Sequence, residues 1–303
     1  MPQIIPASNV RLAVASAALT GESPVWHPRE NALYYVDIPG HKLHRFDPRS
    51  SELRHWEFDT DVACLAPRLD GRLLLAMRDG LWSFDPATGE RSSLEGPPYE
   101  QATERFNDGK CDPQGRFWVG TIYEPRDPPL AALYCYEDGV LAKRVVDITN
   151  LNGLAWSPNG RTMHWSDTKA HTIFAADFDP SSGALSRRRV FAQFPVKRAD
   201  QSLDSYGGRP DGAAMDAEGC YWIAMFEGQR VLRLSPAGEV LCIVELPVRC
   251  PTMPCFGGPD LKTLYISSAR QGRPPAELLD QPWAGCVLAL DVDVPGLPAN
   301  FAI

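Results

Sequence analysis

The stretch Asn107-Asp-Gly-Lys-Cys-Asp-Pro113, with the run Phe117-Trp-Val-Gly-Thr121 close behind it, contains the unit that decides the fold. An amide or acidic side chain stands six residues before a proline, a glycine-bearing turn follows, and an aromatic and β-branched run comes next. Short runs of this kind between turn residues are typical of β-strands. The unit recurs at four other places, with alanine replacing proline in the last: Glu22–Pro28, Asp61–Pro67, Asn152–Pro158 and Asp211–Ala217.

The copies recur at the spacing of propeller blades. Their proline or alanine landmarks fall at positions 28, 67, 113, 158 and 217, so successive copies are 39, 46, 45 and 59 residues apart. A four-stranded blade takes about 40–50 residues. A weaker sixth copy runs from Pro251 to Gly258, and six copies nearly fill the chain. The sequence therefore predicts an all-β, six-bladed β-propeller as a single domain over residues 1–303. A large β-sandwich is the alternative, but it does not explain matched units.

The segment before the first copy is expected to close the ring. Residues 10–16 have the character of a strand, and we expect them to pair as the outer strand of the last blade, because this leaves no open sheet edge. Two stretches, Ile122–Leu130 and Phe194–Pro210, break the strand pattern and are predicted to be loops on a propeller face. Binding residues often gather on such loops.

Composition limits the classes of partner. The net charge of −8 argues against nucleic acid, which requires a basic surface. No run of 18 apolar residues and no signal-peptide pattern is present, so we expect a cytoplasmic protein without a membrane partner. We also expect a monomer. The eight dispersed cysteines predict reduced core thiols, with a redox pair of Cys250 and Cys255 as the alternative.

Equivalent residues of a radial repeat converge on its axis. Glu22, Asn152 and Asp211 therefore bring two carboxylates and one amide oxygen to one end of the central channel. Buried carboxylates need a cation or a proton. Ca²⁺, Mg²⁺ and Mn²⁺ prefer oxygen ligands, and Zn²⁺ or Fe²⁺ accept them. The pattern predicts one divalent cation of open identity, whereas simple loop-to-strand turns at Asn-Gly and Asp-Gly are the structural alternative.

Arg105 precedes Asn107, which holds the ligand-equivalent position of the third copy. We expect Arg105 at the channel mouth, where a guanidinium group can bind hydroxyl or carboxylate oxygens of a substrate. An ion pair with Glu104 or Asp108 is the structural alternative.

Two further acids have several possible roles. Asp61 holds the same position in the second copy, where it would serve as a fourth ligand, a substrate contact or an acid of the rim. Asp167 follows the second strand of the fourth copy and either reaches the pocket, as Lys169 would, or caps the strand end.

The chain as a whole resembles the regucalcin (senescence marker protein)/gluconolactonase family. The resemblance spans nearly the whole chain and rests on these segments: Gly21–Trp26, Tyr35–Pro39, Arg105–Lys110, Asp112–Phe117, Asn152–Trp156, Pro210–Gly212, Cys255–Gly258, Leu264–Ser268 and Gln281–Gly285. It implies a six-bladed propeller that binds one divalent cation and hydrolyses sugar lactones.

The family's site residues match particular positions of this chain. Its metal ligands match Glu22, Asn152 and Asp211, and its substrate-binding arginine and asparagine match Arg105 and Asn107. Glu124 is the nearest candidate for the substrate-contacting acid that follows Gly-Thr in the third blade.

Our hypothesis is metal-assisted opening of an aldonolactone, of gluconolactone or pentonolactone type, to the sugar acid. The cation would polarise the carbonyl and activate water, with Asp211 as the base. No Gly-x-Ser-x-Gly elbow is present, which disfavours a serine nucleophile. Two alternatives remain open: a non-catalytic calcium-binding or ligand-sensing propeller, and a related hydrolase that acts on another ester.

Overall fold

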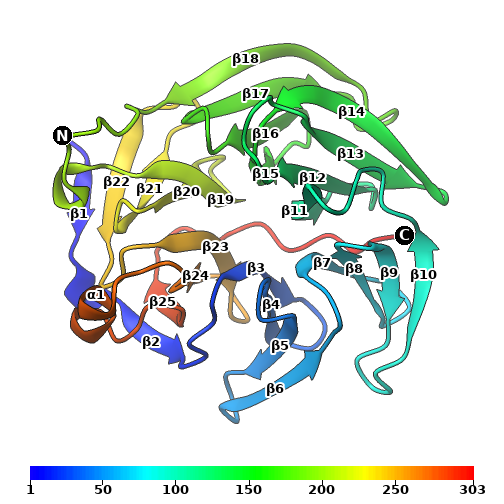
Figure 1. The fold of residues 1–303 in the computed structure, drawn as a ribbon, viewed down its shortest axis with the longest axis horizontal. Coiled ribbons are helices and arrows are strands. Elements are labelled where there is room, and N and C mark those ends of the chain that lie inside the picture. Colours follow the sequence, from blue (N-terminus) through cyan, green and yellow to red (C-terminus); the bar gives the residue numbers. More distant parts are fainter.

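Six sheets surround a central axis in the computed structural model, which describes all 303 residues (Figure 1). Five sheets have four strands and one has five, and within each blade the chain runs antiparallel from the axis outward. The predicted six-bladed β-propeller is confirmed, and six inner strands line the channel (Figure 1). These inner strands are β3 (Gly21–His27), β7 (Val62–Pro67), β11 (Glu104–Cys111), β15 (Leu151–Trp156), β19 (Arg209–Met215) and β23 (Pro251–Gly257).

The remaining strands follow the inner ones in chain order. In the first three blades they are β4 (Ala32–Asp37), β5 (Lys42–Asp47), β6 (Glu52–Glu57), β8 (Leu73–Met77), β9 (Gly80–Phe84), β10 (Arg91–Glu95), β12 (Phe117–Tyr123), β13 (Ala131–Glu137) and β14 (Val140–Ile148). In the last three they are β16 (Thr162–Asp167), β17 (Thr172–Phe178), β18 (Leu185–Gln193), β20 (Tyr221–Phe226), β21 (Arg230–Leu234), β22 (Val240–Glu245), β24 (Thr263–Ser268) and β25 (Val287–Asp291). Helical structure is limited to two 3₁₀ turns, Ala7–Asn9 and Leu203–Ser205, and one helix, α1 (Pro275–Asp280).

The N-terminal segment closes the ring as predicted. Strand β2 (Arg11–Val14) pairs antiparallel with β25 and completes the sixth blade. Strand β1 (Gln3–Ile5) pairs parallel with β22 as a fifth strand of the fifth blade, which the sequence did not predict. The first 14 residues therefore join two adjacent blades and cover both of their outer edges.

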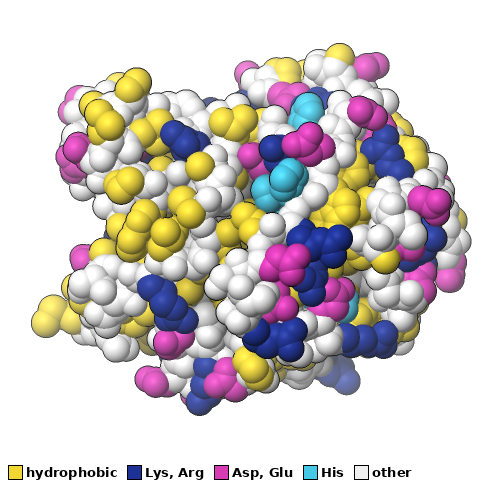
Figure 2. Space-filling model, turned by 90° about the horizontal axis from the view of Figure 1, so that it is seen from below, with side chains coloured by type: hydrophobic (Ala, Val, Ile, Leu, Met, Phe, Trp, Pro, Cys, Tyr) yellow, Lys and Arg dark blue, Asp and Glu magenta, His cyan; other side chains and the backbone are white.

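The edge of the propeller carries charges of both signs. Figure 2 views the disc from the side, and acidic and basic side chains alternate there with hydrophobic ones. Ion pairs such as Arg45–Glu30 at 2.8 Å and Lys42–Glu57 at 3.1 Å lie in the first blade. None of the helices has the length and apolar character needed to cross a membrane.

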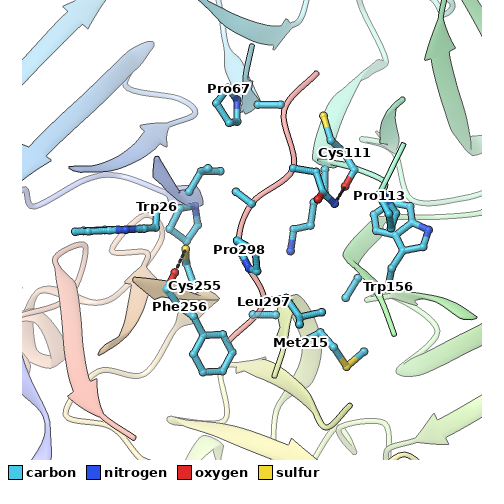
Figure 3. A pocket seen from close by; sticks show the side chains of 18 of the residues that line it. Trp26, Pro67, Cys111, Pro113, Trp156, Met215, Cys255, Phe256, Leu297 and Pro298 are labelled. Carbon is cyan, nitrogen blue, oxygen red and sulfur yellow. Dashed lines mark hydrogen bonds between the residues drawn. The ribbon is translucent and has the colours of Figure 1, made fainter. Parts of the chain in front are cut away.

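The C-terminal segment crosses one end of the channel (Figure 1). Its backbone amides bond inner strands of several blades, from Leu297 to the Met215 carbonyl at 3.1 Å and from Ala302 to the Pro67 carbonyl at 2.7 Å. Between this segment and the channel wall lies a cavity of about 250 Å³, lined by apolar side chains such as Trp156 (Figure 3). No carboxylate lines this cavity.

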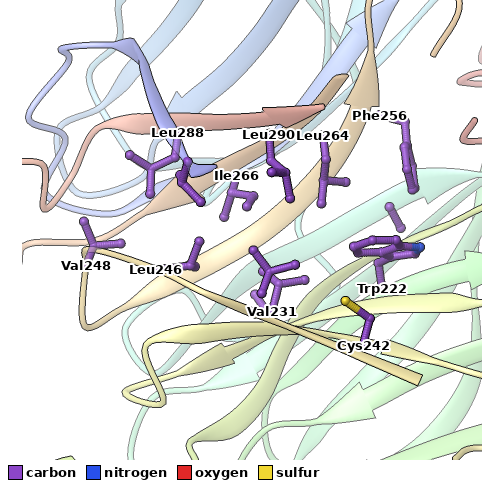
Figure 4. Packing of buried hydrophobic residues seen from close by; sticks show 14 residues of the cluster. Trp222, Val231, Cys242, Leu246, Val248, Phe256, Leu264, Ile266, Leu288 and Leu290 are labelled. Atoms are coloured by element: carbon purple, nitrogen blue, oxygen red, sulfur yellow. The ribbon is translucent and has the colours of Figure 1, made fainter. Parts of the chain in front are cut away.

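The hydrophobic core consists of six clusters, each of which fills the space between two adjacent blades. Figure 4 shows one of them, in which Trp222 and Val231 of the fifth blade face Leu264 and Leu288 of the sixth. Neighbouring blades cover both faces of each blade, so strands near the axis can be apolar along their whole length. Strand β8, the second strand of its blade, is an example, because every one of its residues is buried. All eight cysteines are free thiols, and seven are buried, as predicted.

Every inner strand contains a β-bulge where it pairs with the second strand of its blade. The register shifts lie at Glu22/Val25, Val62/Cys64, Phe106/Gly109, Asn152/Ala155, Pro210/Ala213 and Pro251/Pro254. A bulge bends the strand and turns side chains in a new direction. Gly153 lies in one of them at φ 69°, and a Cβ there would collide with the Tyr221 hydroxyl. The bulges occur beside the predicted ligand positions and set the direction of their side chains.

Candidate active site

The predicted ligands lie at the start of three inner strands, at the channel end opposite the C-terminal segment. Glu22 is on β3, Asn152 on β15 and Asp211 on β19. Their exposed fractions are only 8%, 2% and 7%. Inner strands of a propeller run in the same direction, so their first residues meet at one mouth of the channel. The structure thus brings two carboxyl groups and one amide together in a site that excludes most solvent.

Burial and mutual repulsion disfavour the charged forms of both acids. Burial raises the pKa of Glu22 well above its usual value, and Asp211 and Asp108 raise it further, although the Ser23 N–H bonds Glu22 Oε2 at 3.0 Å. Burial also raises the pKa of Asp211 to about 8, opposed by Arg209 and reinforced by Asp108. Two carboxylates here need a positive charge beside them in order to ionise at neutral pH.

The donors of this site fit a hard divalent cation. No side-chain hydrogen bond engages the Asp211 carboxylate, whose oxygens stay available. Asp108, from the neighbouring blade, has a buried Oδ1 atom without any partner. No three His, Cys, Asp or Glu side chains form a metal-binding group, so a cation here depends on the Asn152 amide oxygen as well as on the carboxylates. Oxygen-only donor sets of this kind suit Ca²⁺, Mg²⁺ or Mn²⁺.

The Asn152 side chain is held in one orientation. Its Nδ2 donates to Thr168 Oγ1 at 2.8 Å, so Oδ1 points the other way. Asn107 Nδ2 donates to that Oδ1, also at 2.8 Å, and bonds Asn150 Oδ1 and the Leu151 carbonyl as well. Such partners fix the direction of a ligand oxygen. Thr168 was not identified from the sequence.

Arg105 lies at the mouth beside Asn107, as expected. Its Nη1 donates to Asn107 Oδ1 at 3.0 Å and to the Phe106 carbonyl at 2.8 Å. The alternative pairing with Glu104 or Asp108 is not found, because Glu104 bonds the Thr121 hydroxyl and Asp108 accepts the Leu154 N–H.

Asp61 lies at the rim, where its carboxylate is engaged by Arg78. Its carboxylate accepts two hydrogen bonds from Arg78, at 2.9 and 2.8 Å, and lies 3.1 Å from His41. Arg78 also bonds both oxygens of Glu124, at 3.0 and 2.9 Å. The Glu124 carboxylate lies 3.6 Å from Arg105 Nε, so it reaches the mouth. Its contact with a substrate stays a prediction.

Asp167 caps the end of its strand. Its carboxylate accepts N–H groups of Thr149 at 3.0 Å, Asn150 at 3.3 Å and Lys169 at 3.2 Å. These bonds hold the start of β15 next to the end of β16 and leave Asp167 committed to the backbone.

A six-bladed propeller with carboxylate, amide and guanidinium groups at one channel mouth is the class of protein that this fold and site define. Comparisons with known proteins agree. The family model described as SMP-30/Gluconolactonase/LRE-like region matches residues 20–270. The 6-deoxy-6-sulfogluconolactonase of Pseudomonas putida is 41% identical over 291 residues, which cover 95% of this chain and 96% of that protein.

Two regucalcins extend the comparison. Regucalcin of Danio rerio is 36% identical, with 92% of each chain covered. The solved structure of a calcium-binding protein, regucalcin, from Agrobacterium tumefaciens superposes with a TM-score of 0.92 at 26% identity and covers 100% of both chains. The protein belongs to the SMP-30/gluconolactonase/LRE-like family, as its sequence motifs indicated, and has lactonases among its homologues over nearly its full length.

Proposed function

We propose that this protein is a divalent-cation-dependent lactonase that opens a sugar lactone to the sugar acid. The observation that carries the proposal is the pair of buried acids, Glu22 and Asp211, at one mouth of the channel, where burial disfavours their ionisation without a cation. The homologous lactonase of Pseudomonas putida supports the reaction class.

Glu22, Asn152 and Asp211 would hold the cation. Bound there, it would supply a Lewis acid for the lactone carbonyl and lower the pKa of a water molecule. Asn107 and Thr168 support this role because they hold the Asn152 amide in a single orientation.

Asp211 acts as the base in this proposal. Its carboxylate, free of hydrogen bonds, accepts a proton from the attacking water as the new carbon–oxygen bond forms at the carbonyl carbon. The bond from that carbon to the ring oxygen then breaks, and the proton passes from Asp211 to the ring oxygen, which becomes a hydroxyl group. The product is the open-chain acid, and Asp211 is again a carboxylate.

Arg105 and Asn107 orient the substrate. Only one terminal nitrogen of Arg105 is used in hydrogen bonds within the protein, so its other donors remain for lactone oxygens. Glu124, next to Arg105 at 3.6 Å, is positioned to accept a hydrogen bond from a sugar hydroxyl. Fixed polar groups around a bound substrate lower the entropic part of the barrier.

A second candidate function is calcium binding without turnover. It is favoured by the Agrobacterium tumefaciens homologue, which is described as a calcium-binding protein. The same oxygen donors would serve it.

Acid release from a panel of aldonolactones would test the proposal. Protein treated with a chelator is assayed before and after resupply with Ca²⁺, Mg²⁺, Mn²⁺, Zn²⁺ or Fe²⁺. We expect activity to vanish with the chelator, to return with at least one ion, and to be lost in Asp211→Asn but not in Asp200→Asn, an acid of an exposed loop. Turnover that persists in the chelator would contradict the cation requirement, and cation binding without any turnover would favour the second function.

A further inference from the structure

The segment between β12 and β13 carries an arginine whose side chain has no partner. Arg126 forms neither a side-chain hydrogen bond nor an ion pair, although it is one of four arginines near the mouth. Arg78 and Arg105, in contrast, are bonded to Asp61, Glu124 or Asn107. An arginine without a counter-ion retains all five of its N–H donors.

The backbone presents this side chain from an anchored position. Arg126 has φ 69°, in the left-handed region that residues with a side chain adopt only rarely. Its N–H donates to the Tyr123 carbonyl at 2.9 Å, and the N–H of Glu124 donates to the Thr103 carbonyl at 2.9 Å. Non-glycine residues in such conformations concentrate at ligand-binding positions.

Arg126 stands within electrostatic reach of the candidate catalytic acid. The side chain is exposed to solvent, yet loss of hydration and Arg209 lower the pKa of Arg126, whereas Asp211, Glu124 and Asp167 raise it. Both Arg126 and Arg209 in turn lower the pKa of Asp211, against the larger effect of burial. Glu124, two residues before Arg126, lies 3.6 Å from Arg105 Nε, so the segment that carries Arg126 borders the mouth.

Arg209 is itself only partly neutralised. Its Nη1 lies 3.0 Å from Glu227, and its guanidinium group stacks over Phe226 at 4.9 Å. Glu227 also pairs with Arg273 at 3.3 Å, so this one carboxylate is shared between two arginines. Asp61 and Glu124, by contrast, form ion pairs or hydrogen bonds with Arg78 and lie within 4.0 Å of Arg105. Among these arginines, Arg126 has no carboxylate at ion-pair distance and Arg209 shares one.

We propose that Arg126, with Arg209 beside it, binds an anionic substituent of the substrate, so that the preferred substrates are sugar lactones that carry a sulfonate, phosphate or carboxylate group. The inference rests on the proposed lactonase function and specifies its substrate class. A guanidinium group presents a planar set of donors that matches the oxygens of these anions. The lactone carbonyl would lie over Asp211 and the anionic end against the β12–β13 segment.

The test compares one neutral lactone with three anionic ones. The values of kcat/KM for gluconolactone, 6-deoxy-6-sulfogluconolactone, 6-phosphogluconolactone and the monolactone of glucaric acid are measured at low and high salt. We expect at least one anionic lactone to exceed gluconolactone by about 10- to 100-fold, the effect of one charged hydrogen-bonded pair. The advantage should fall as salt rises. Sulfonate and phosphate groups are tetrahedral, whereas a carboxylate is planar, so the three anionic lactones also show which shape of anion the site prefers.

Variants assign the effect to the residue. Arg126→Gln should lower the ratio of anionic to neutral kcat/KM by about tenfold or more, and Arg126→Lys should restore part of it. Arg144→Gln, an exposed unpaired arginine on the outer strand β14 of the same blade, should leave the ratio unchanged. Hydrolysis of gluconolactone with no anionic preference, or an equal loss for both substrate classes in Arg126→Gln, would overturn the inference and leave the lactonase proposal standing.

A binding measurement separates the inference from catalysis. Calorimetric titration of 6-phosphogluconate, 6-deoxy-6-sulfogluconate, glucarate and gluconate into Asp211→Asn protein reports the anion subsite without turnover. Tighter binding of an anionic sugar acid than of gluconate, lost in the added Arg126→Gln change, would support the subsite even if no lactone were hydrolysed. Equal binding of all four acids would overturn it.

Discussion

Asn107 and Asn152 are joined across two blades by a hydrogen bond of 2.8 Å from Asn107 Nδ2 to Asn152 Oδ1. The same amide nitrogen also contacts Asn150 Oδ1 and the Leu151 carbonyl, so three oxygens surround one donor group. Asn107 is therefore a proposed substrate contact that also fixes the position of a proposed metal ligand. Substrate and cation binding should be coupled through this pair.

Asn107→Asp should disable the site. An aspartate places a carboxylate oxygen opposite three acceptor oxygens where a donor is required, so the Asn152 side chain should be displaced. We expect cation affinity to fall by about 10- to 100-fold, as for other changes to residues that orient a metal ligand. Calorimetric cation titration measures this, with Asn9→Asp, an exposed residue near the N-terminus, as control. An unchanged cation affinity would show that the position of the Asn152 side chain does not depend on Asn107.

Thr168→Val should weaken cation binding without unfolding the protein. Valine keeps the shape of threonine but removes the Oγ1 acceptor of Asn152 Nδ2, so the amide is free to rotate. We expect about a tenfold rise in the cation Kd. A loss of activity that excess cation restores would identify Thr168 as a positioning residue. A loss that excess cation does not restore would argue for another role.

Glu22→Gln should stabilise the cation-free protein. Burial first, and then Asp211 and Asp108, disfavour the charged form of Glu22, so a neutral isostere removes a cost of folding. We expect Tm in chelator to rise by about 2–4 °C. The rise in Tm on adding cation should shrink at the same time, because a ligand charge is lost. Glu245→Gln, an exposed acid of β22, is the matched control. A lower Tm for Glu22→Gln than for the parent protein in chelator would contradict the conclusion that the charge of Glu22 is unfavourable.

The propeller fold could be predicted from the sequence because each blade repeats the same local sequence features. Turn residues and apolar runs recur in every copy and the ligand position recurs in five of the six, so the inner strands and closure by β2 could be predicted. Strand β1 could not, because its pairing of Gln3 with Cys242 joins distant residues that carry no repeated pattern. The crossing of the channel by the C-terminal segment depends on the same kind of long-range contact.

The candidate site could be predicted only in part from the sequence, for a related reason. Glu22, Asn152 and Asp211 share one repeat position and were identified from it. Arg78 and Thr168 lie directly after the second strand of a blade, which runs antiparallel to the inner strand and ends beside its start. Polar residues that follow second strands are a signal for this class of site. The direction of their side chains still depends on loops and bulges.

Asp216→Asn should destabilise the fifth blade strongly. The Asp216 carboxylate, fully buried, accepts hydrogen bonds from Trp222 Nε1 at 2.9 Å and from Arg233 Nε at 2.8 Å. Removal of its charge leaves the Arg233 guanidinium group poorly paired, at a cost of about 3–5 kcal/mol. Glu218→Gln changes the other, exposed partner of Arg233 and should cost less than about 1 kcal/mol. Denaturant unfolding measures both, and equal costs would contradict the role of burial.

His164 should make stability sensitive to acid. The ring lies between β15 and β17 and contacts Phe191 edge-on at 4.8 Å and Tyr221 at 5.4 Å, with a buried Nδ1 that has no hydrogen-bond partner. Burial lowers its pKa to about 4, and Arg189 contributes to the shift. The folded protein therefore holds this ring in its neutral form.

The unfolded chain binds a proton at His164 below about pH 6.5, whereas the folded protein does so only below about pH 4. The stabilising contribution of the neutral ring is thus complete above pH 6.5 and is lost as the pH falls from 6.5 towards 4. His164→Phe removes this proton uptake, so the decrease in Tm between pH 7 and pH 5 should become smaller. His55→Phe changes an exposed ring on β6 and should leave that decrease unaltered. If His164→Phe and the parent protein lose the same Tm over this range, the acid sensitivity comes from other groups.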